Sequence, residues 1–272
     1  MRKILEDLDL SSLSQILGIS LQELQDISEI APKLYSFSQI PKKNGKSRKL
    51  EIPHQNLKKT QKIILQKILN QMELHPKLYG GPGTSTKKAA YIHTKKHLLI
   101  TSDIKDFFPS VKAHHIRKMF LRYGASREIS NMLTRLVTHS NHLPQGSPTS
   151  PAIGRFVLQP FAEEFENILS KIPRAAFSVY VDDIILSGPE TIKGFLSTIR
   201  KILFRYGLEI NDKTKLMYRH EEQICLNIRV NNGIAPPTSY INELRELSKI
   251  FPLSHPKLKG KYSYVAYLKR SD

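Results

Sequence analysis

Residues 177–186 read Phe-Ser-Val-Tyr-Val-Asp-Asp-Ile-Ile-Leu, and this segment carries the strongest structural signal in the chain. Two apolar runs, Phe177–Val181 and Ile184–Ser187, are separated by only two residues, which predicts an antiparallel β-hairpin. Adjacent carboxylates at the tip of a largely buried hairpin repel each other and are costly to desolvate. Because a divalent cation removes that cost, Asp182 and Asp183 are candidate metal ligands. The alternative, a solvated polar turn, would not need such apolar flanks.

A second acidic site has the same design. Leu98–Ser102 is predicted to be an apolar strand, and Asp103 follows it directly. If this strand neighbours the hairpin, Asp103 meets Asp182 and Asp183 across the sheet. Three carboxylates could then hold two Mg²⁺ ions, an arrangement that supports in-line displacement at phosphorus. Taken alone, Asp103 is equally well explained as a helix cap after a strand.

A loop rich in glycine and proline lies between these two sites. Residues 143–151 read Leu-Pro-Gln-Gly-Ser-Pro-Thr-Ser-Pro, and Thr149 or Ser150 can cap the helix that follows. Free amides at a helix N-terminus can bind a phosphate or a base. The alternative is a plain turn into a helix.

Composition restricts the class of protein. The 272 residues include 42 lysines and arginines against 24 aspartates and glutamates, a formal net charge of +18 that favours a polyanionic partner. Hydrophobic residues make up 40% of the chain, enough for a sizeable core. The single cysteine, Cys225, excludes an internal disulfide framework and a multi-cysteine zinc site. Since no apolar run approaches the ~18 residues of a membrane span, we expect a cytoplasmic protein without a membrane partner.

Helical and strand patterns are mixed, which predicts an α+β fold rather than a doubly wound parallel sheet. A basic hairpin is expected over residues 41–52, with Asn44 and Gly45 at its tip, and Pro160 should bend or split the helix that contains it. The helices are predicted within residues 1–32, 61–72, 112–123, 149–171 and 190–206, and the strands at residues 98–102, 177–181, 184–187 and 224–230.

Three motifs together resemble reverse transcriptases, most closely the bacterial retron-type enzymes. They are Asp-Ile-Lys-Asp-Phe-Phe-Pro-Ser at 103–110, the loop at 143–151, and Tyr-Val-Asp-Asp at 180–183, in the family's order and spacing. The likeness runs from about Ile40 to Val230. It implies a right-hand polymerase fold with an antiparallel palm sheet, divided into an N-terminal helical cap (1–34), fingers (35–100), a palm (101–232, with a fingers-type insertion around 112–140) and a short, reduced thumb (233–272).

The resemblance also implies roles for individual residues. Asp103, Asp182 and Asp183 would be the catalytic carboxylates that bind two Mg²⁺ ions. Ile104 would also belong to the metal site. Lys213 would protonate the pyrophosphate leaving group, with Lys215 as the alternative. The residues that would bind the incoming nucleotide are Arg48 and Lys46 at the triphosphate, Phe108 as a steric gate against the 2′-hydroxyl, and Gln145 and Gly146 at the nascent base pair.

Four residues are predicted to contact RNA. His93 and Asn227 lie in partial matches to two retron-associated motifs, in which alanine replaces an asparagine and Asn227 replaces a glycine. Lys87 and Lys88 follow the Gly80–Gly83 loop, which could bring them to a nucleic-acid backbone.

The function implied is RNA-directed DNA polymerisation from deoxynucleoside triphosphates. A structured noncoding RNA would act as template and primer, the product would be a small single-stranded DNA (msDNA) joined to RNA, and an effector protein would act with the enzyme in antiphage defence. One alternative is a reverse transcriptase of another bacterial defence system or of an intron-like lineage. Another is a non-polymerising RNA-binding subunit on a polymerase scaffold.

Overall fold

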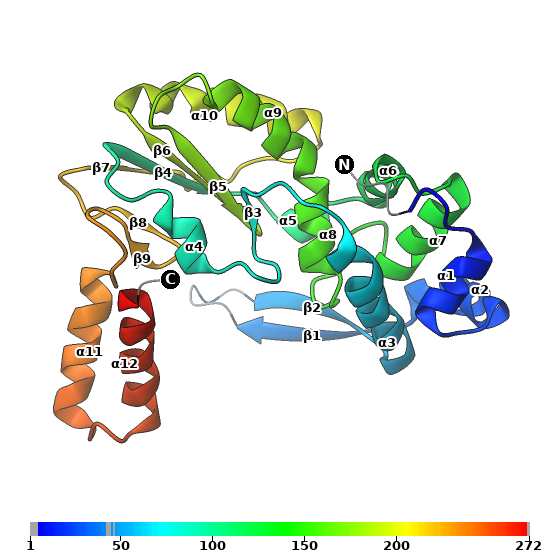
Figure 1. Ribbon diagram of the computed structural model, residues 1–272. Coiled ribbons are helices and arrows are strands. Elements are labelled where there is room, and N and C mark those ends of the chain that lie inside the picture. The colour runs from blue at the N-terminus through cyan, green and yellow to red at the C-terminus, as the bar shows by residue number, and fades with distance from the viewer. Residues whose placement is uncertain (1–4, 42–44, 46, 271–272) are drawn as a thin grey trace. The chain divides into compact units, whose positions relative to one another are not determined.

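The computed structural model describes residues 5–41, 45 and 47–270 (Figure 1). Within the described part of the chain, every helix is too short or too polar to span a bilayer. The chain divides into two compact units: the first comprises Met1–Pro82, Lys105–Glu163 and Ile202–Glu209, and the second comprises Gly83–Ile104, Glu164–Lys201 and Ile210–Asp272.

The first unit is mainly helical and includes one β-hairpin. Side-chain caps explain where its first two helices begin: Asp9 accepts a hydrogen bond from Ser12 N, and Ser20 accepts one from Glu23 N. Its elements are α1 (Leu10–Leu17), α2 (Leu21–Ile30), β1 (Tyr35–Pro41), β2 (Ser47–Pro53), α3 (Gln55–Ile63), which continues as a π-helix and a 3₁₀ turn to Gln71, β3 (Leu78–Tyr79), α5 (Phe107–Ser110), α6 (Ala113–Arg122), α7 (Arg127–Val137) and α8 (Ser150–Val157).

The predicted basic hairpin is confirmed. Strands β1 and β2 pair in antiparallel register from Tyr35 opposite Pro53 to Pro41 opposite Ser47. Gly45 has a φ of 77°, which suits a glycine in a turn. The rest of the predicted tip, including Asn44 and Lys46, lies outside the described residues.

The second unit is built on an antiparallel sheet with neighbouring strands in the order β5-β6-β4-β7. This confirms the predicted α+β class and the antiparallel sheet. The predicted hairpin of β5 and β6 is confirmed, but its turn lies one residue earlier than predicted: Tyr180 pairs with Asp183, so Val181 and Asp182 form the connection. The strands are β4 (Leu98–Asp103), β5 (Ala176–Tyr180), β6 (Asp183–Gly188) and β7 (Lys215–Tyr218).

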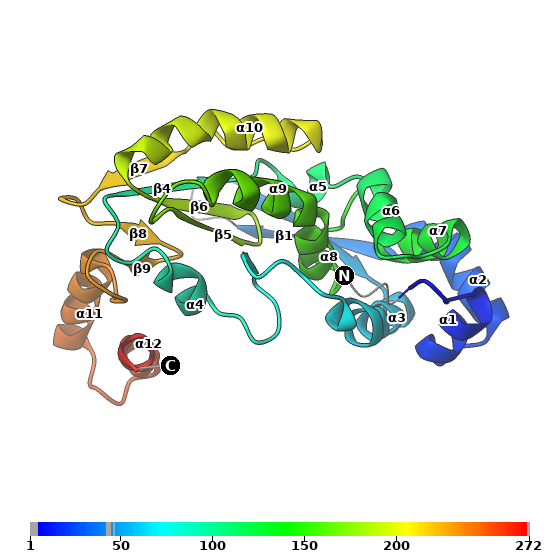
Figure 2. The same ribbon diagram turned by 45° about the horizontal axis from the view of Figure 1, so that its top comes forward.

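Helix α10 (Phe195–Arg205) and the C-terminal part of α9 (Gln159–Leu169) cover one face of this sheet, as Figures 1 and 2 both show. Phe165 of α9 meets Phe177 of β5 edge to face, with ring centroids 5.1 Å apart. The helix predicted over 149–171 is indeed split: α8 ends at Val157, and α9 carries Pro160 in its first turn, where a missing N–H is tolerated.

Helix α4 (Thr86–Tyr91), two short strands and the C-terminal part of the last helix pack on the opposite face. The core here joins Leu99 and Ile185 of the sheet to Ala90, Cys225 and Leu268. The remaining elements are β8 (Ile224–Cys225), β9 (Ile228–Arg229), α11 (Thr238–Ile250) and α12 (Pro256–Lys269).

The prediction of a single strand over residues 224–230 is wrong. The chain instead folds back between β8 and β9, which pair in antiparallel fashion. Leu226 and Asn227 have φ values of 51° and 60°, so the turn has both central residues in the left-handed region. Both Cys225 and Ile228 remain buried, which is why the apolar pattern resembled one continuous strand.

Candidate active site

The acidic residues of the two predicted strands meet at one end of the sheet. Asp103, the last residue of β4, lies directly opposite Asp183, the first residue of β6. Because side chains alternate along a strand, Asp103 and Asp183 share the sheet face that carries Leu99 and Ile185. The backbone N–H of Ile104 donates to Asp182 O at 2.9 Å, which ties the end of β4 to the turn of the hairpin.

The turn itself is strained. Val181 and Asp182 form the two-residue connection between the paired Tyr180 and Asp183. Val181 has a φ of 59°, a conformation that β-branched residues rarely adopt. Such strain persists only where surrounding structure enforces it, and it gathers at functional sites. Here the β5–β6 pairing enforces the turn and fixes both carboxylates at its end.

Asn211 makes two hydrogen bonds to Asp103. Its backbone N–H donates to Asp103 O at 2.7 Å, and its amide Nδ2 donates to Asp103 Oδ2 at 3.2 Å. Its Oδ1 also accepts a hydrogen bond from Lys213 N at 3.3 Å. The sequence analysis gave Asn211 no role, although its place two residues before Lys213 was an available signal.

Asp103, Asp183 and Lys213 line a cleft of about 490 Å³. Partial burial in the cleft and the negative charges of Asp182 and Asp103 raise the pKa of Asp183 to about 6. The carboxylates at this end of the sheet thus disfavour one another's charge. Its polar lining includes Asp103, Asp183, Lys213, Lys215, Asn227 and Ser239.

The donor set suits a hard divalent cation. Mg²⁺ prefers carboxylate oxygens and commonly uses only one or two protein carboxylates, with substrate phosphates and water completing its shell. The raised pKa of Asp183 shows that a nearby positive charge would be favourable. Among residues 5–41, 45 and 47–270, no three His, Cys, Asp or Glu side chains form a preassembled metal cluster. The structure thus brings Asp103 and Asp183 to opposed positions, but it does not gather all three predicted carboxylates into one cluster.

The residues predicted to bind the nucleotide belong to the first unit. Arg48 is exposed on β2, and Phe108 is half-buried on α5 with its ring 5.4 Å from that of Phe107. The carbonyl of Gln145 accepts a hydrogen bond from Glu51 N at 2.8 Å. Gly146 has a φ of 134°, and a Cβ there would lie 2.9 Å from Glu51 O, so this position requires glycine. Lys46 lies outside the described residues.

The prediction that the side chain of Thr149 or Ser150 caps the helix after this loop is wrong. Thr149 occupies the N-cap position of α8, but its hydroxyl pairs with Ser147 Oγ at 2.9 Å. The Ser150 hydroxyl donates to Pro144 O at 2.7 Å. Both hydroxyls therefore hold the loop in shape.

Two of the four residues predicted to contact RNA have internal roles instead. His93 is fully buried, and its ring nitrogens hydrogen-bond to Ser187 Oγ at 2.7 Å and Ser178 Oγ at 2.8 Å. Lys87 is 5% exposed, and its Nζ donates to Arg270 O at 2.6 Å. A contact of either side chain with RNA is therefore not supported. Lys88 and Asn227 are exposed, and Asn227 lines the acidic cleft.

The antiparallel sheet, with carboxylates from two neighbouring strands beside lysines, agrees with the polymerase palm that the sequence motifs imply. Comparison with known proteins gives the family: residues 40–251 match the model for reverse transcriptase (RNA-dependent DNA polymerase). The chain belongs to the reverse transcriptase family.

The curated relatives of this chain include retron enzymes. It is 28% identical to the retron Mx65 reverse transcriptase of Myxococcus xanthus over 80% of this chain and 57% of that protein. It is also 28% identical to the retron Se72 enzyme of Salmonella heidelberg (80% and 60%) and the retron Ec86 enzyme of Escherichia coli (75% and 65%). The predicted resemblance to retron-type enzymes is confirmed. The aligned regions cover less than two thirds of the length of these relatives.

Substituting His93 tests its assignment to the core. His93→Ala leaves two buried serine hydroxyls without their imidazole partner, so we expect the free energy of unfolding to fall by about 2–5 kcal/mol. The exposed Lys88→Ala should change it by less than about 0.5 kcal/mol. Chemical denaturation of both variants measures this. A His93→Ala protein of unchanged stability that loses affinity for RNA would restore the RNA-contact role.

Proposed function

We propose that this chain is an RNA-directed DNA polymerase of the retron type. The observation that carries the proposal is the cross-strand pair Asp103 and Asp183, set in a cleft that also contains Lys213. Family membership and the retron relatives support the same reaction. In it, a primer hydroxyl attacks the α-phosphate of a deoxynucleoside triphosphate, and pyrophosphate leaves.

The acidic end of the sheet would provide the metal site. Asp103, Asp182 and Asp183, with Ile104 beside them, would hold two Mg²⁺ ions. Bound there, the ions supply charge stabilisation to the attacking and leaving oxygens. Asn211 would keep the Asp103 carboxylate oriented through its amide.

The lysines of the cleft would act on the leaving group. Lys213 is exposed at the cleft, and its backbone N–H is held by Asn211 Oδ1. An ammonium group placed there can stabilise the departing pyrophosphate and donate a proton to it. Lys215 lines the same cleft and is the alternative donor.

The nucleotide-binding residues would select and orient the triphosphate. Arg48 offers the planar set of donors that suits phosphate oxygens. The Phe108 ring would stand against the sugar and leave no room for a 2′-hydroxyl. Gln145 and Gly146 would line the nascent base pair.

The template would be a structured noncoding RNA that also supplies the primer. The net charge of +18 favours contacts with phosphate groups, and Lys88 and Asn227 are the exposed candidates for contacts with RNA. The product would be a short single-stranded DNA joined to RNA, made in a system that includes an effector protein and acts against phage. The similarity to retron reverse transcriptases supports this choice over other bacterial reverse transcriptases.

Removing one carboxylate tests the reaction. Asp183→Asn should lower the rate of primer extension on an RNA template with Mg²⁺ by at least about 100-fold, because several kcal/mol of transition-state stabilisation are lost. RNA affinity in a filter-binding assay should stay unchanged. The exposed Asp26→Asn, a matched change on α2, should retain full extension. If the wild-type chain extends nothing and Asp183→Asn binds RNA equally well, the protein is an RNA-binding subunit instead.

Shortening Phe108 tests the selection of the sugar. Phe108→Ala opens space for a 2′-hydroxyl, so the preference for deoxynucleotides over ribonucleotides in kcat/KM should fall by about 10- to 200-fold. Phe204→Ala is the matched control, since Phe204 is 72% exposed on α10. Single-nucleotide incorporation kinetics measure the ratio. Unchanged discrimination in Phe108→Ala would remove this residue from the role of gate.

A further inference from the structure

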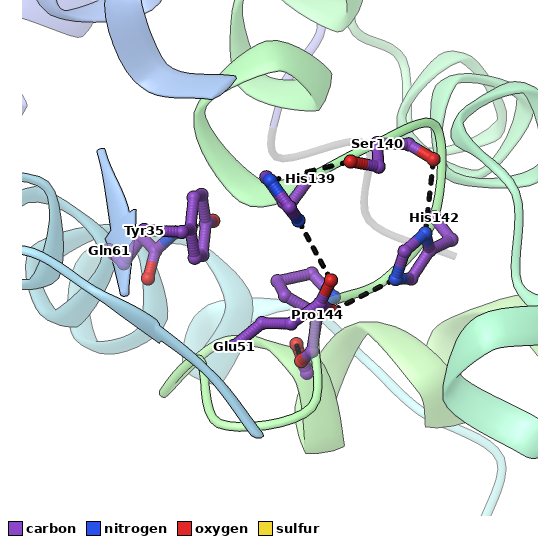
Figure 3. Close-up of polar contacts among 8 residues, drawn as sticks. Tyr35, Glu51, Gln61, His139, Ser140, His142 and Pro144 are labelled. Atoms are coloured by element: carbon purple, nitrogen blue, oxygen red, sulfur yellow. Dashed lines mark hydrogen bonds and ion pairs between the residues drawn. The ribbon is translucent and has the colours of Figure 1, made fainter. Parts of the chain in front are cut away.

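Glu51 joins two parts of the chain that are far apart in sequence. It lies on β2, and its side chain is only 14% exposed. One carboxylate oxygen accepts from His139 Nδ1 at 2.8 Å, and the other accepts from His142 Nε2 at 2.9 Å (Figure 3). Both oxygens are therefore engaged by the segment that leads into the 143–151 loop. We call Glu51, His139 and His142 the Glu51 clamp.

A tight turn places the two imidazoles on the same side. His139 N donates to His142 O at 3.0 Å, and His142 N donates back to His139 O at 2.9 Å. The two residues between them, Ser140 and Asn141, both have positive φ, at 45° and 64°. In such a turn the flanking residues form a directly opposed pair, so their side chains share a face. The turn thus presents both rings to a single carboxylate.

Both oxygens of the Glu51 carboxylate have a ring nitrogen as hydrogen-bond partner. His142 Nε2 contacts Glu51, and His142 Nδ1 lies 3.0 Å from Ser140 O. The Glu51 side chain is thus engaged on both oxygens in a largely buried setting. Removing one partner of a buried hydrogen bond leaves the other group unsatisfied, which costs more than the bond itself contributes.

Aromatic packing keeps the clamp in place. The His139 ring lies 4.6 Å from the Tyr35 ring and 5.7 Å from the Phe37 ring, both on β1. Figure 3 shows Tyr35 and Gln61 beside the clamp. Gln61 Nε2 donates to Tyr35 OH at 2.9 Å, and Ser147 Oγ donates to Gln61 Oε1 at 2.8 Å. A second buried chain of hydrogen bonds therefore links β1 to the same loop.

The backbone of Glu51 fixes the residues next to the clamp. Its N–H donates to Gln145 O, and its carbonyl oxygen leaves no room for a side chain at Gly146. Arg48 lies three residues before Glu51 on the same strand. One residue thus sets the position of the strand that carries Arg48 relative to the loop that carries Gln145.

We infer that the Glu51 clamp positions Arg48 and Gln145 for the incoming deoxynucleoside triphosphate, without itself touching the substrate. This assignment rests on the proposed function. Loss of the clamp removes two of the hydrogen bonds between hairpin and loop and leaves the Glu51 N–Gln145 O bond and the Tyr35–Gln61–Ser147 chain, so Arg48 and Gln145 are held less firmly and bind the nucleotide more weakly. The carboxylates of the cleft belong to the other unit, so the chemical step at saturating nucleotide is retained.

The test is a separation of KM from kcat in primer extension. Glu51→Ala should raise the KM for the deoxynucleotide about 10-fold, as expected for the loss of a charged hydrogen-bonded partner, with kcat changed less than about twofold. Glu51→Gln keeps the size of the side chain but places an NH₂ group against one ring donor, so its KM should be intermediate. It also carries the test if Glu51→Ala does not fold.

Two further variants separate positioning from general stability. His142→Ala should raise KM similarly, and the double variant with Glu51→Ala should be no worse than either single one, since both remove the same interaction. Ser126→Ala removes the N-cap of α7 in the same unit and should lower the thermal midpoint without changing KM.

Unchanged KM in Glu51→Ala and Glu51→Gln, or additive effects in the double variant, would overturn the clamp while leaving the proposed function intact. A wild-type chain that extends no primer would overturn the proposed function and this assignment with it.

Discussion

Asp103 and Asp183 occupy directly opposed positions on neighbouring strands, at the end of a sheet whose other paired positions are largely apolar. Two carboxylates at opposed positions repel each other, and this repulsion contributes to the raised pKa of Asp183. Several features of the second unit maintain the arrangement against that repulsion: the strained Val181 turn, the backbone bond from Ile104 to Asp182, and the two hydrogen bonds from Asn211. Strain and repulsion at a defined place are typical of a functional site, because they are tolerated where a ligand or substrate relieves them.

The residues with proposed roles belong to both units. The second unit contains the acidic cleft with its lysines, and the first contains the residues proposed to select and grip the nucleotide. In the first unit, both oxygens of the Glu51 carboxylate have a ring nitrogen as hydrogen-bond partner. The proposed roles follow this difference: carboxylates that repel one another suit a cation and phosphates, whereas a hydrogen-bonded, largely buried carboxylate suits a part that must stay in place.

Sequence patterns predicted the hairpin of residues 177–187, the basic hairpin, the split at Pro160 and the meeting of Asp103 with Asp183, because each depends on local periodicity or on one strand pairing. They could not place side chains whose environment is set by distant parts of the chain. His93 was assigned to RNA from a motif, but it is buried between two strand serines 85 and 94 residues away. The prediction of one strand over residues 224–230 was wrong because an apolar run does not reveal a turn inside it. Glu51, His139 and His142 meet across 88 and 91 residues, a contact that no local pattern indicates.

Metal-directed cleavage of the polypeptide tests the central claim most directly, namely that carboxylates far apart in sequence share one metal site. Fe²⁺ replaces Mg²⁺ in the purified protein, and ascorbate with peroxide then generates radicals that cut the backbone close to the bound ion. The account predicts paired cuts near residue 103 and near residues 182–183, both suppressed by excess Mg²⁺ and both lost in Asp103→Asn. Cuts confined to one of these segments, or at neither of them, would contradict a shared metal site.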